Sequence, residues 1–364
     1  MHRITTLLTT LVACAAAALA GPAPATAATD ATFAMPERLV VLGFTAGQLD
    51  PLRATLIEKN LIDEEGHWIG GSAHYVQLGD VMLFGDEVLP SLEMIHRLSQ
   101  EASEAGGRVT FVLGPSLYMA LRRDISNIPR ENYDPMATEG SDARLEAVLD
   151  TLLEQLWEYN ADQEESVRKR LRQNYADYYR RTHFPGAVEF MDAMGPDTEL
   201  GQWLRQSPAV LRIGDLVLAN GGVSEKYSSM SIDEINRLML EDATSDTVWV
   251  PKMADLEAPL WWKELSSESE GNMIPSVRRI LEELGADAMV VAHSPRLGES
   301  MLRVDNRVYH LQSGLSADAD QEALIATLEV TPQRWLFTVG ARKFETQAPR
   351  PTTPAPPQAP DDEG

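Results

Sequence analysis

The stretch Val76-Gln77-Leu78-Gly79-Asp80-Val81-Met82-Leu83-Phe84-Gly85 predicts a buried strand that ends at a carboxylate and is followed by a loop returning to glycine. Short apolar runs of this kind are typical of strands in α/β sheets, and open α/β sheets place their ligands at the carboxyl ends of the strands. Asp80 is therefore the first candidate for a functional residue. The alternative is that Asp80 only caps the turn that follows it, and this stretch alone does not decide between the two.

Further strands of the same kind lie on both sides of this stretch. Arg38–Leu42 is an apolar run that leads into Gly43, and Arg108–Leu113 is another that leads into Gly114. Leucines at helical spacing follow the first run, and Leu89–Ala105 has the same pattern before the third. Three consecutive β-α units that each turn at glycine predict an α/β sheet.

The pattern changes after the third unit. Residues 124–201 carry no strand signal, and Leu145–Tyr159 and Glu164–Arg181 have the spacing of helices, which predicts a helical insertion or lid. The second helix carries a basic cluster, which we expect to pair with neighbouring carboxylates. Strand signals then return; they are Val210–Ile213, Leu216–Ala219, Ala288–Ala292, Met301–Val304, Arg307–Leu311, Ala323–Val330 and Trp335–Val339. The first two flank the two-residue turn Gly214-Asp215 and predict a hairpin.

The two ends of the sequence differ in composition from its body. Residues 1–27 have the basic start, the apolar run and the small-residue cleavage site of an export signal, which predicts a periplasmic or extracellular protein. The single cysteine, Cys14, lies inside this signal and leaves no disulfide in the mature chain. Leu11-Val12-Ala13-Cys14 also resembles a lipoprotein cleavage box, so membrane attachment is expected only if Cys14 is lipidated. Residues 346–364 are rich in proline and acidic at the tip, and predict a disordered tail.

The net charge narrows the classes of partner. The chain has 31 Lys plus Arg against 55 Asp plus Glu, a formal charge of -24. A field of this sign repels nucleic acid at long range, so no nucleic-acid partner is expected.

Taken in order, the strand-end junctions resemble those of the calcineurin-like metallophosphoesterases, and most closely those of the Shewanella-like protein phosphatases. That family carries the motifs G-D-x-H-G, G-D-x-x-D-R-G, G-N-H-E, H-G-G and G-H-T-P. The corresponding places here hold Gly43-Phe44-Thr45-Ala46-Gly47, residues 79–85, Gly114-Pro115-Ser116-Leu117, Asn220-Gly221-Gly222 and Ala292-His293-Ser294-Pro295. The resemblance spans about residues 37–316. It implies an α/β sandwich of two mixed β-sheets flanked by helices, formed by residues 28–345 with the helical insertion at 124–201, and metals at one edge.

The resemblance also implies a set of metal ligands, most of which are replaced here. Asp80 stands at the bridging carboxylate and His293 at a late histidine ligand, and both keep the family residue. Asn220 replaces a histidine and is a weaker oxygen ligand. The other ligand, clamp and acid positions hold residues that cannot serve in those roles; they are Phe44, Ala46, Leu83, Phe84, Pro115 and, at the position of the catalytic acid, Ser116. The metal-binding motifs are therefore degenerate, and a dinuclear site is not expected.

These substitutions lead to one main hypothesis and two alternatives. The main hypothesis is an exported pseudophosphatase that has no catalytic residues and no cofactor and acts by binding a protein partner or a phosphorylated ligand. The first alternative is an active metal-dependent phosphoesterase with a rearranged or mononuclear site, in which Asp80, His293 and Asn220 hold one Mn, Fe or Zn ion, with Asp86, Glu87 or His310 recruited nearby. The second is a structural module of an envelope complex.

Overall fold

A computed structural model describes residues 31–78, 80–245, 255–292, 301–311, 325–339, 342–346 and 348–349. The predicted export signal and His293 lie outside these residues, as does most of the predicted tail. Among the described residues, no helix combines the length and the apolar character that a membrane span requires.

The strands of the described residues form two six-stranded sheets. One sheet has the order β1-β5-β6-β7-β9-β8, and its strands are β1 (Thr32–Phe33), β5 (Val210–Ile213), β6 (Leu216–Ala219), β7 (Ala288–Val291), β9 (Val308–His310) and β8 (Met301–Arg303). The other has the order β12-β11-β10-β2-β3-β4, and its strands are β12 (Arg342–Thr346), β11 (Arg334–Val339), β10 (Ala326–Thr331), β2 (Leu39–Leu42), β3 (His74–Gln77) and β4 (Arg108–Phe111). Each sheet contains parallel and antiparallel pairs. This architecture confirms the predicted sandwich of two mixed sheets.

The central strands are apolar along their whole length because both of their faces are buried. In β2, Leu39 and Val41 lie in the core cluster between the two sheets, whereas Val40 and Leu42 lie in the larger cluster that also includes the helices. All four side chains are fully buried. Alternate side chains of a strand point to opposite faces. When both faces are covered, every side chain is buried, and the strand is apolar at each position. This is why the strands before the glycine junctions were readable as continuous apolar runs.

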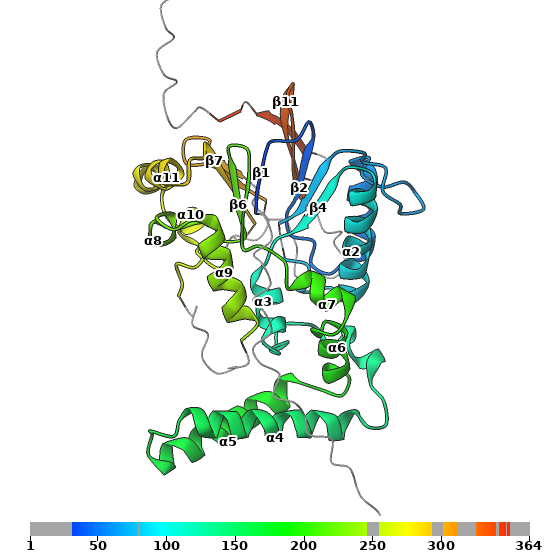
Figure 1. Ribbon diagram of the computed structural model, residues 1–364, viewed down its shortest axis with the longest axis vertical. Coiled ribbons are helices and arrows are strands. Elements are labelled where there is room, and N and C mark those ends of the chain that lie inside the picture. The colour runs from blue at the N-terminus through cyan, green and yellow to red at the C-terminus, as the bar shows by residue number, and fades with distance from the viewer. Residues whose placement is uncertain are drawn as a thin grey trace, which may run out of the picture.

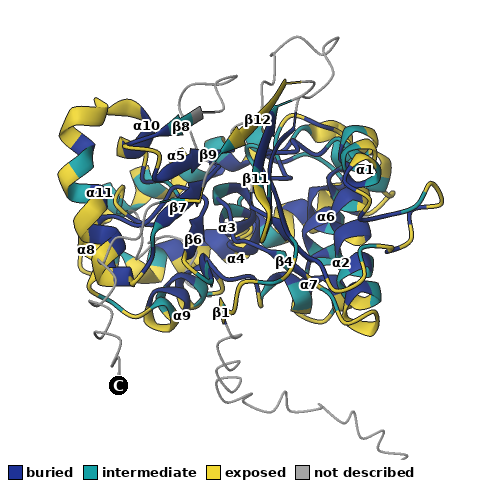
Figure 2. Ribbon diagram, turned by 90° about the horizontal axis from the view of Figure 1, so that it is seen from above, coloured by how far each residue is buried: buried dark blue, intermediate teal, exposed yellow. Residues whose placement is uncertain are grey.

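Helices cover the outer faces of the two sheets, with α2 packed against β4 and α9 against β5 (Figures 1 and 2). The α-helices of the described residues are α1 (Leu49–Glu58), α2 (Val88–Glu104), α3 (Pro115–Leu121), α4 (Ser141–Tyr159), α5 (Glu165–Thr182), α6 (Ala187–Ala193), α7 (Glu199–Leu204), α8 (Glu225–Ser228), α9 (Ile232–Ala243), α10 (Glu264–Ser267) and α11 (Glu270–Leu284). Short 3-10 helices occupy Arg130–Asn132 and Asp134–Met136.

Residues 124–201 form helices and loops without a strand, and α4 and α5 stand away from the sheets (Figure 1). Part of the basic cluster on α5 is paired as expected. Arg180 bonds Glu146 of α4 at 2.7 Å and Lys169 bonds Glu165 at 2.6 Å. The Arg168 guanidinium lies 3.8 Å from the centre of the Trp157 ring. The exposed pairs contribute little individually, and buried residues of both helices, such as Leu149 of α4 and Tyr179 of α5, belong to the larger core cluster.

Two strands were not predicted, and both lie at sheet edges. β1 has only two residues, which is too short for a periodic signal. β12 is exposed at four of its five positions and has the sequence Arg-Lys-Phe-Glu-Thr, without alternation of apolar and polar residues. β12 ends at Thr346, so the first residue of the segment predicted as a tail belongs to the sheet.

Gly43, at the end of β2, allows a close approach between the two sheets. A Cβ atom added there would lie 1.8 Å from the main-chain oxygen of Leu311, which follows β9. We therefore expect Gly43→Ala to lower the free energy of unfolding by about 2 kcal/mol or more, because backbone must move to admit the methyl group. The measurement is urea unfolding followed by circular dichroism.

Gly140→Ala is the matched control for this substitution. Gly140 precedes α4 with φ of -92°, and nothing lies within 4 Å of an added Cβ. We expect its free energy of unfolding to stay within about 0.5 kcal/mol of the parent value. Equal losses in the two variants would contradict the close approach at Gly43.

Candidate functional site

Two neighbouring strand-end loops are joined by main-chain hydrogen bonds. The loop after β2 donates the N–H groups of Thr45 and Ala46 to the main-chain oxygen of Asp80, both at 3.2 Å. Gly85 N returns a bond of 2.7 Å to Ala46 O. A Cβ at Gly85 would lie 2.2 Å from Gly47 O, so only glycine fits there. The loops after β2 and β3 therefore form one rigid unit at the carboxyl ends of the strands.

The Asp80 side chain is buried and is directed toward α3. Its Oδ2 accepts a hydrogen bond of 3.1 Å from the main-chain N–H of Ser116, in the first turn of that helix. Burial raises the pKa of Asp80 above its usual value, and the hydrogen bonds from Ser116 oppose this rise. The first N–H groups of a helix have no partner within the helix. Asp80 supplies one of these partners from a strand end 36 positions earlier in the chain.

Asn220, at the end of β6, is brought close to Asp80. A Cβ added at Gly114 would lie 3.2 Å from Asn220 Nδ2 and 3.6 Å from Asp80 Oδ1, so both side chains border the same glycine. Asn220 is 2% exposed, and its Nδ2 donates to the main-chain oxygen of Leu78 at 3.1 Å. The structure thus gathers Asp80, Ser116 and Asn220 around Gly114. His293 follows β7, the neighbour of β6, and lies outside the described residues.

The replaced ligand positions form a small apolar cluster beside this group. Phe44 and Ala46 are buried and pack with Leu83. Phe84 lies edge-on to Phe44, with ring centroids 6.1 Å apart, and is 62% exposed. Ala46 and Phe84 have φ values of 61° and 68°, a left-handed conformation that costs roughly 1–2 kcal/mol for a residue with a Cβ. The loop conformation is therefore held by the bonds to Asp80 and Gly85.

The donors in this region do not fit a two-metal centre. Phe44, Ala46 and Leu83 offer no ligand atom. The Asp80 carboxylate accepts from Ser116 N, and Asn220 uses its amide N–H on Leu78. Across the described residues, no three His, Cys, Asp or Glu side chains are grouped as a metal would require.

Glu87 and His310, which the first alternative recruits as metal ligands, make other contacts in the structure. Glu87 Oε2 accepts from the main-chain N–H of Leu49 at 3.1 Å, at the start of α1. His310 is buried on β9, and burial together with the charge of Arg303 lowers its pKa to about 4. Its neighbours Tyr309 and Leu311 face the core between the sheets, so His310 faces the other side of its sheet.

Two further residues contribute to this region without a functional signal in the sequence, Ser116 and Asn132. The resemblance gives Ser116 only as a replaced acid, whereas its main-chain N–H donates to Asp80. Asn132 of the insertion was not singled out. Its Nδ2 donates to Gly85 O at 2.8 Å, and its Oδ1 accepts from Val88 N at 2.9 Å. Pro115 at the first position of α3 was the available signal for a helix start there.

Comparisons with known proteins found similar sequences and similar folds. Shewanella-like protein phosphatase 2 of Arabidopsis thaliana is 28% identical over 205 residues, which cover 56% of this chain and 51% of the plant protein. The matched region thus spans about half the length of that relative. No family model matches the chain. A cold-active protein tyrosine phosphatase, solved at 1.1 Å, superposes with a TM-score of 0.63 at 20% identity, covering 88% of this chain and 81% of that one. The corresponding enzyme of a psychrophilic Shewanella species gives 0.61.

The two sheets and the order of their strand-end loops define a protein with the calcineurin-like metallophosphoesterase fold. Within that class, the sequence is similar to that of a Shewanella-like protein phosphatase over 56% of this chain.

Two substitutions of Asp80 test whether the structure needs its hydrogen-bond acceptor or its negative charge. Asp80→Asn keeps an oxygen that can accept from Ser116 N and removes the buried carboxylate. We therefore expect its free energy of unfolding to match or exceed that of the parent. Asp80→Ala leaves the Ser116 N–H without its acceptor and should lose about 1–3 kcal/mol. Urea unfolding at pH 7 measures both.

Asp215→Ala, in the exposed turn between β5 and β6, controls for removal of a carboxylate and should change the stability by no more than about 0.5 kcal/mol. A loss in Asp80→Asn as large as in Asp80→Ala would show that the charge itself is required.

Proposed function

We propose that this chain is a catalytically degenerate phosphatase-fold protein, a pseudophosphatase, which acts by binding rather than by hydrolysis. The observation that supports this most is the use of the Asp80 carboxylate. In the resembling family that position bridges two metals, whereas here it accepts a hydrogen bond from Ser116 N inside a buried group. A carboxylate held in this way has given up part of its capacity as a ligand.

The replaced positions argue against hydrolysis on chemical grounds. Metal-dependent phosphoester hydrolysis uses bound metal to generate the attacking hydroxide and to neutralise charge in the transition state. Phe44 and Ala46 provide neither a ligand nor space for water, because both are buried against Leu83. Hydroxide generation and charge neutralisation by the metal supply most of the rate enhancement. No described residue nearby replaces the metal in these two roles.

The acid and the phosphate clamp are also replaced. Ser116 stands at the position of the family acid and is fully buried, with its hydroxyl accepting from Asn127 Nδ2 at 2.9 Å. Its usual pKa is far too high for proton donation at neutral pH. Phe84 stands at the position of a clamping arginine and is exposed. It presents an aromatic ring where the family presents a cation.

We also propose that the protein is exported, on the strength of the signal-like composition of residues 1–27. Lipidation at Cys14 would then anchor it, and cleavage after Ala27 would release it.

Metal content and turnover, measured on the same sample, test the proposal. Tag-free mature protein from Ala28 is incubated with manganese, iron or zinc, desalted and analysed for metal, then assayed with p-nitrophenyl phosphate and a phosphotyrosine peptide. The Arabidopsis relative serves as the positive control. We expect less than about 0.1 metal per chain and no turnover above that of buffer.

Asp80→Asn and His293→Ala identify any site that does bind metal, with Asp215→Asn as the matched surface control. About one metal per chain or more, with turnover that both variants abolish and the control retains, would refute the pseudophosphatase proposal. That result would favour a rearranged mononuclear phosphoesterase.

A further inference from the structure

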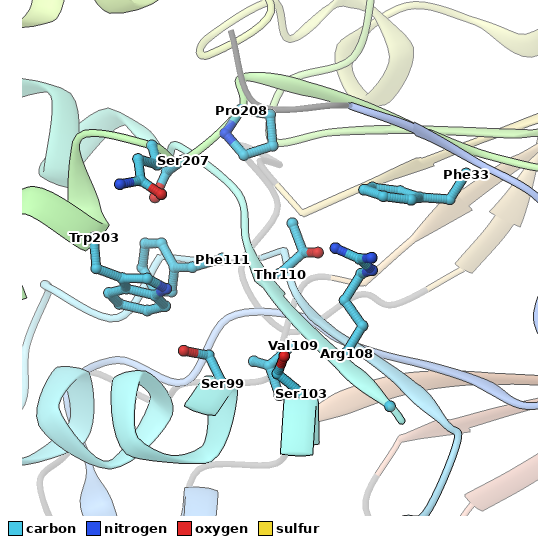
Figure 3. A pocket seen from close by; sticks show the side chains of 12 residues that line it. Phe33, Ser99, Ser103, Arg108, Val109, Thr110, Phe111, Trp203, Ser207 and Pro208 are labelled. Atoms are coloured by element: carbon cyan, nitrogen blue, oxygen red, sulfur yellow. The ribbon is translucent and has the colours of Figure 1, made fainter. Parts of the chain in front are cut away.

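A cavity of about 240 Å³ lies beside β4, away from the strand-end loops of the candidate site (Figure 3). Its walls come from five parts of the chain: β4 with the preceding Gly107, Ser99 and Ser103 of α2, Trp203 of α7, the segment 206–208 before β5, and Phe33 of β1. Phe33 and Arg108 lie at one end of the cavity, and Trp203 and Phe111 at the other (Figure 3). The cavity therefore runs along the outer edge of the strand.

The main-chain groups on this edge of β4 are open. β4 is the last strand of its sheet and pairs only with β3. Arg108 N and Val112 N donate toward β3, to Ala73 O and Gln77 O, both at 3.0 Å. Alternate residues of a strand direct their main-chain groups to opposite edges, so those of Val109 and Phe111 point outward. Within the described part of the chain, these outward groups have no hydrogen-bond partner, and both residues line the cavity.

The chain itself shows how this edge accepts a partner. The next outward residue, Leu113, donates its N–H to Pro208 O at 2.8 Å. A segment distant in the sequence is thus already bonded to the edge just beyond β4. The open positions at Val109 and Phe111 continue the same edge back toward Phe33. Open strand edges are ready templates for an added strand.

The side chains around the edge indicate the chemistry of such a strand. Arg108 is exposed, and its guanidinium lies 4.3 Å from the centre of the Phe33 ring. No carboxylate of the described residues lies within ion-pair distance of it, although acidic residues outnumber basic ones 55 to 31 in the chain. At the other end, Trp203 packs on Phe111 with ring centroids 5.6 Å apart and remains partly exposed. The two ends of the cavity therefore suit an acidic and an apolar side chain.

His74 of β3 does not add to the positive charge that Arg108 brings to the cavity. Its Nε2 lies 2.9 Å from Thr110 Oγ1, and burial together with the charge of Arg108 lowers its pKa to about 3. The imidazole is neutral at pH 7.

We propose that this cavity is a peptide-binding site, in which an extended acidic segment of a partner protein adds as a strand to β4 through the main-chain groups of Val109 and Phe111. This site is separate from the strand-end loops around Asp80. The proposal does not depend on whether the chain hydrolyses phosphoesters.

Hydrogen exchange of the full mature chain with a defined probe tests this proposal. The probe is acetyl-Asp-Thr-Val-Thr-Val-Asp-amide, which has an acidic residue at each end and so serves either strand direction. We expect it to slow amide exchange in peptic fragments that contain Val109 and Phe111. The same peptide with both valines replaced by proline lacks two N–H groups and should give no such protection.

Charge reversal at the two edges of the same sheet provides the matched comparison. Arg108→Glu should weaken binding of the probe about tenfold or more. Arg342→Glu makes the same change on exposed β12, the opposite edge strand, and should leave binding within about twofold. Both side chains are exposed, so both variants are expected to fold.

Several results would overturn the proposal. They are the absence of protection at Val109 and Phe111 with millimolar probe, equal protection by the proline-containing peptide, and protection confined to Arg342–Thr346. Equal weakening of probe binding by Arg108→Glu and Arg342→Glu would show that only the net charge of the protein matters, and would exclude a specific site at β4.

Discussion

The arrangement of the strand-end loops depends on the hydrogen bonds made by Asp80. Its main-chain oxygen accepts the N–H groups of Thr45 and Ala46, and its carboxylate accepts that of Ser116. One residue at the end of β3 thereby fixes the loop after β2 and the first turn of the helix after β4. Because these are neighbouring strands of one sheet, their carboxyl ends share one edge, and a single buried acceptor can reach both.

The apolar replacements around Asp80 follow from the cost of burying charge. A cluster of carboxylates is stable in a buried position when cations compensate it, and one that lacks this compensation is strongly destabilising. Here Phe44, Ala46 and Leu83 pack together where the related family has ligands and an orienting carboxylate. The carboxylate that persists is bonded to the N-terminal turn of α3, where the helix dipole also favours negative charge. Within the described residues, Asp80 thus has a main-chain N–H donor and apolar neighbours around it.

Much of the fold could be predicted from the sequence, because buried strands leave a local signal. Leu39–Leu42 and Ala288–Val291 are apolar at every position since both faces are covered, and the turn at Gly214 and Asp215 delimits the hairpin of β5 and β6. β12 left no such signal, because its exposed side chains carry no pattern. The contact of Asp80 with Ser116 could not be predicted either, since it joins residues 36 positions apart and depends on how β3 and β4 pair. The sequence therefore placed Asp80 at the end of a strand, but it did not indicate the hydrogen bond of Asp80 with Ser116.

The two edges of the β2 sheet are protected in different ways. β12 presents Arg342, Lys343 and Glu345 to solvent, and charged side chains on an edge strand oppose pairing with other chains. β4 has no comparable charge along its exposed edge beyond Arg108, and its apolar side chains belong to the core with α2. Its outward edge is instead set back in a cavity between α2, Phe33 and the segment before β5. A recessed edge would hinder pairing with a large flat sheet and, under the proposal above, would leave room for a single extended segment.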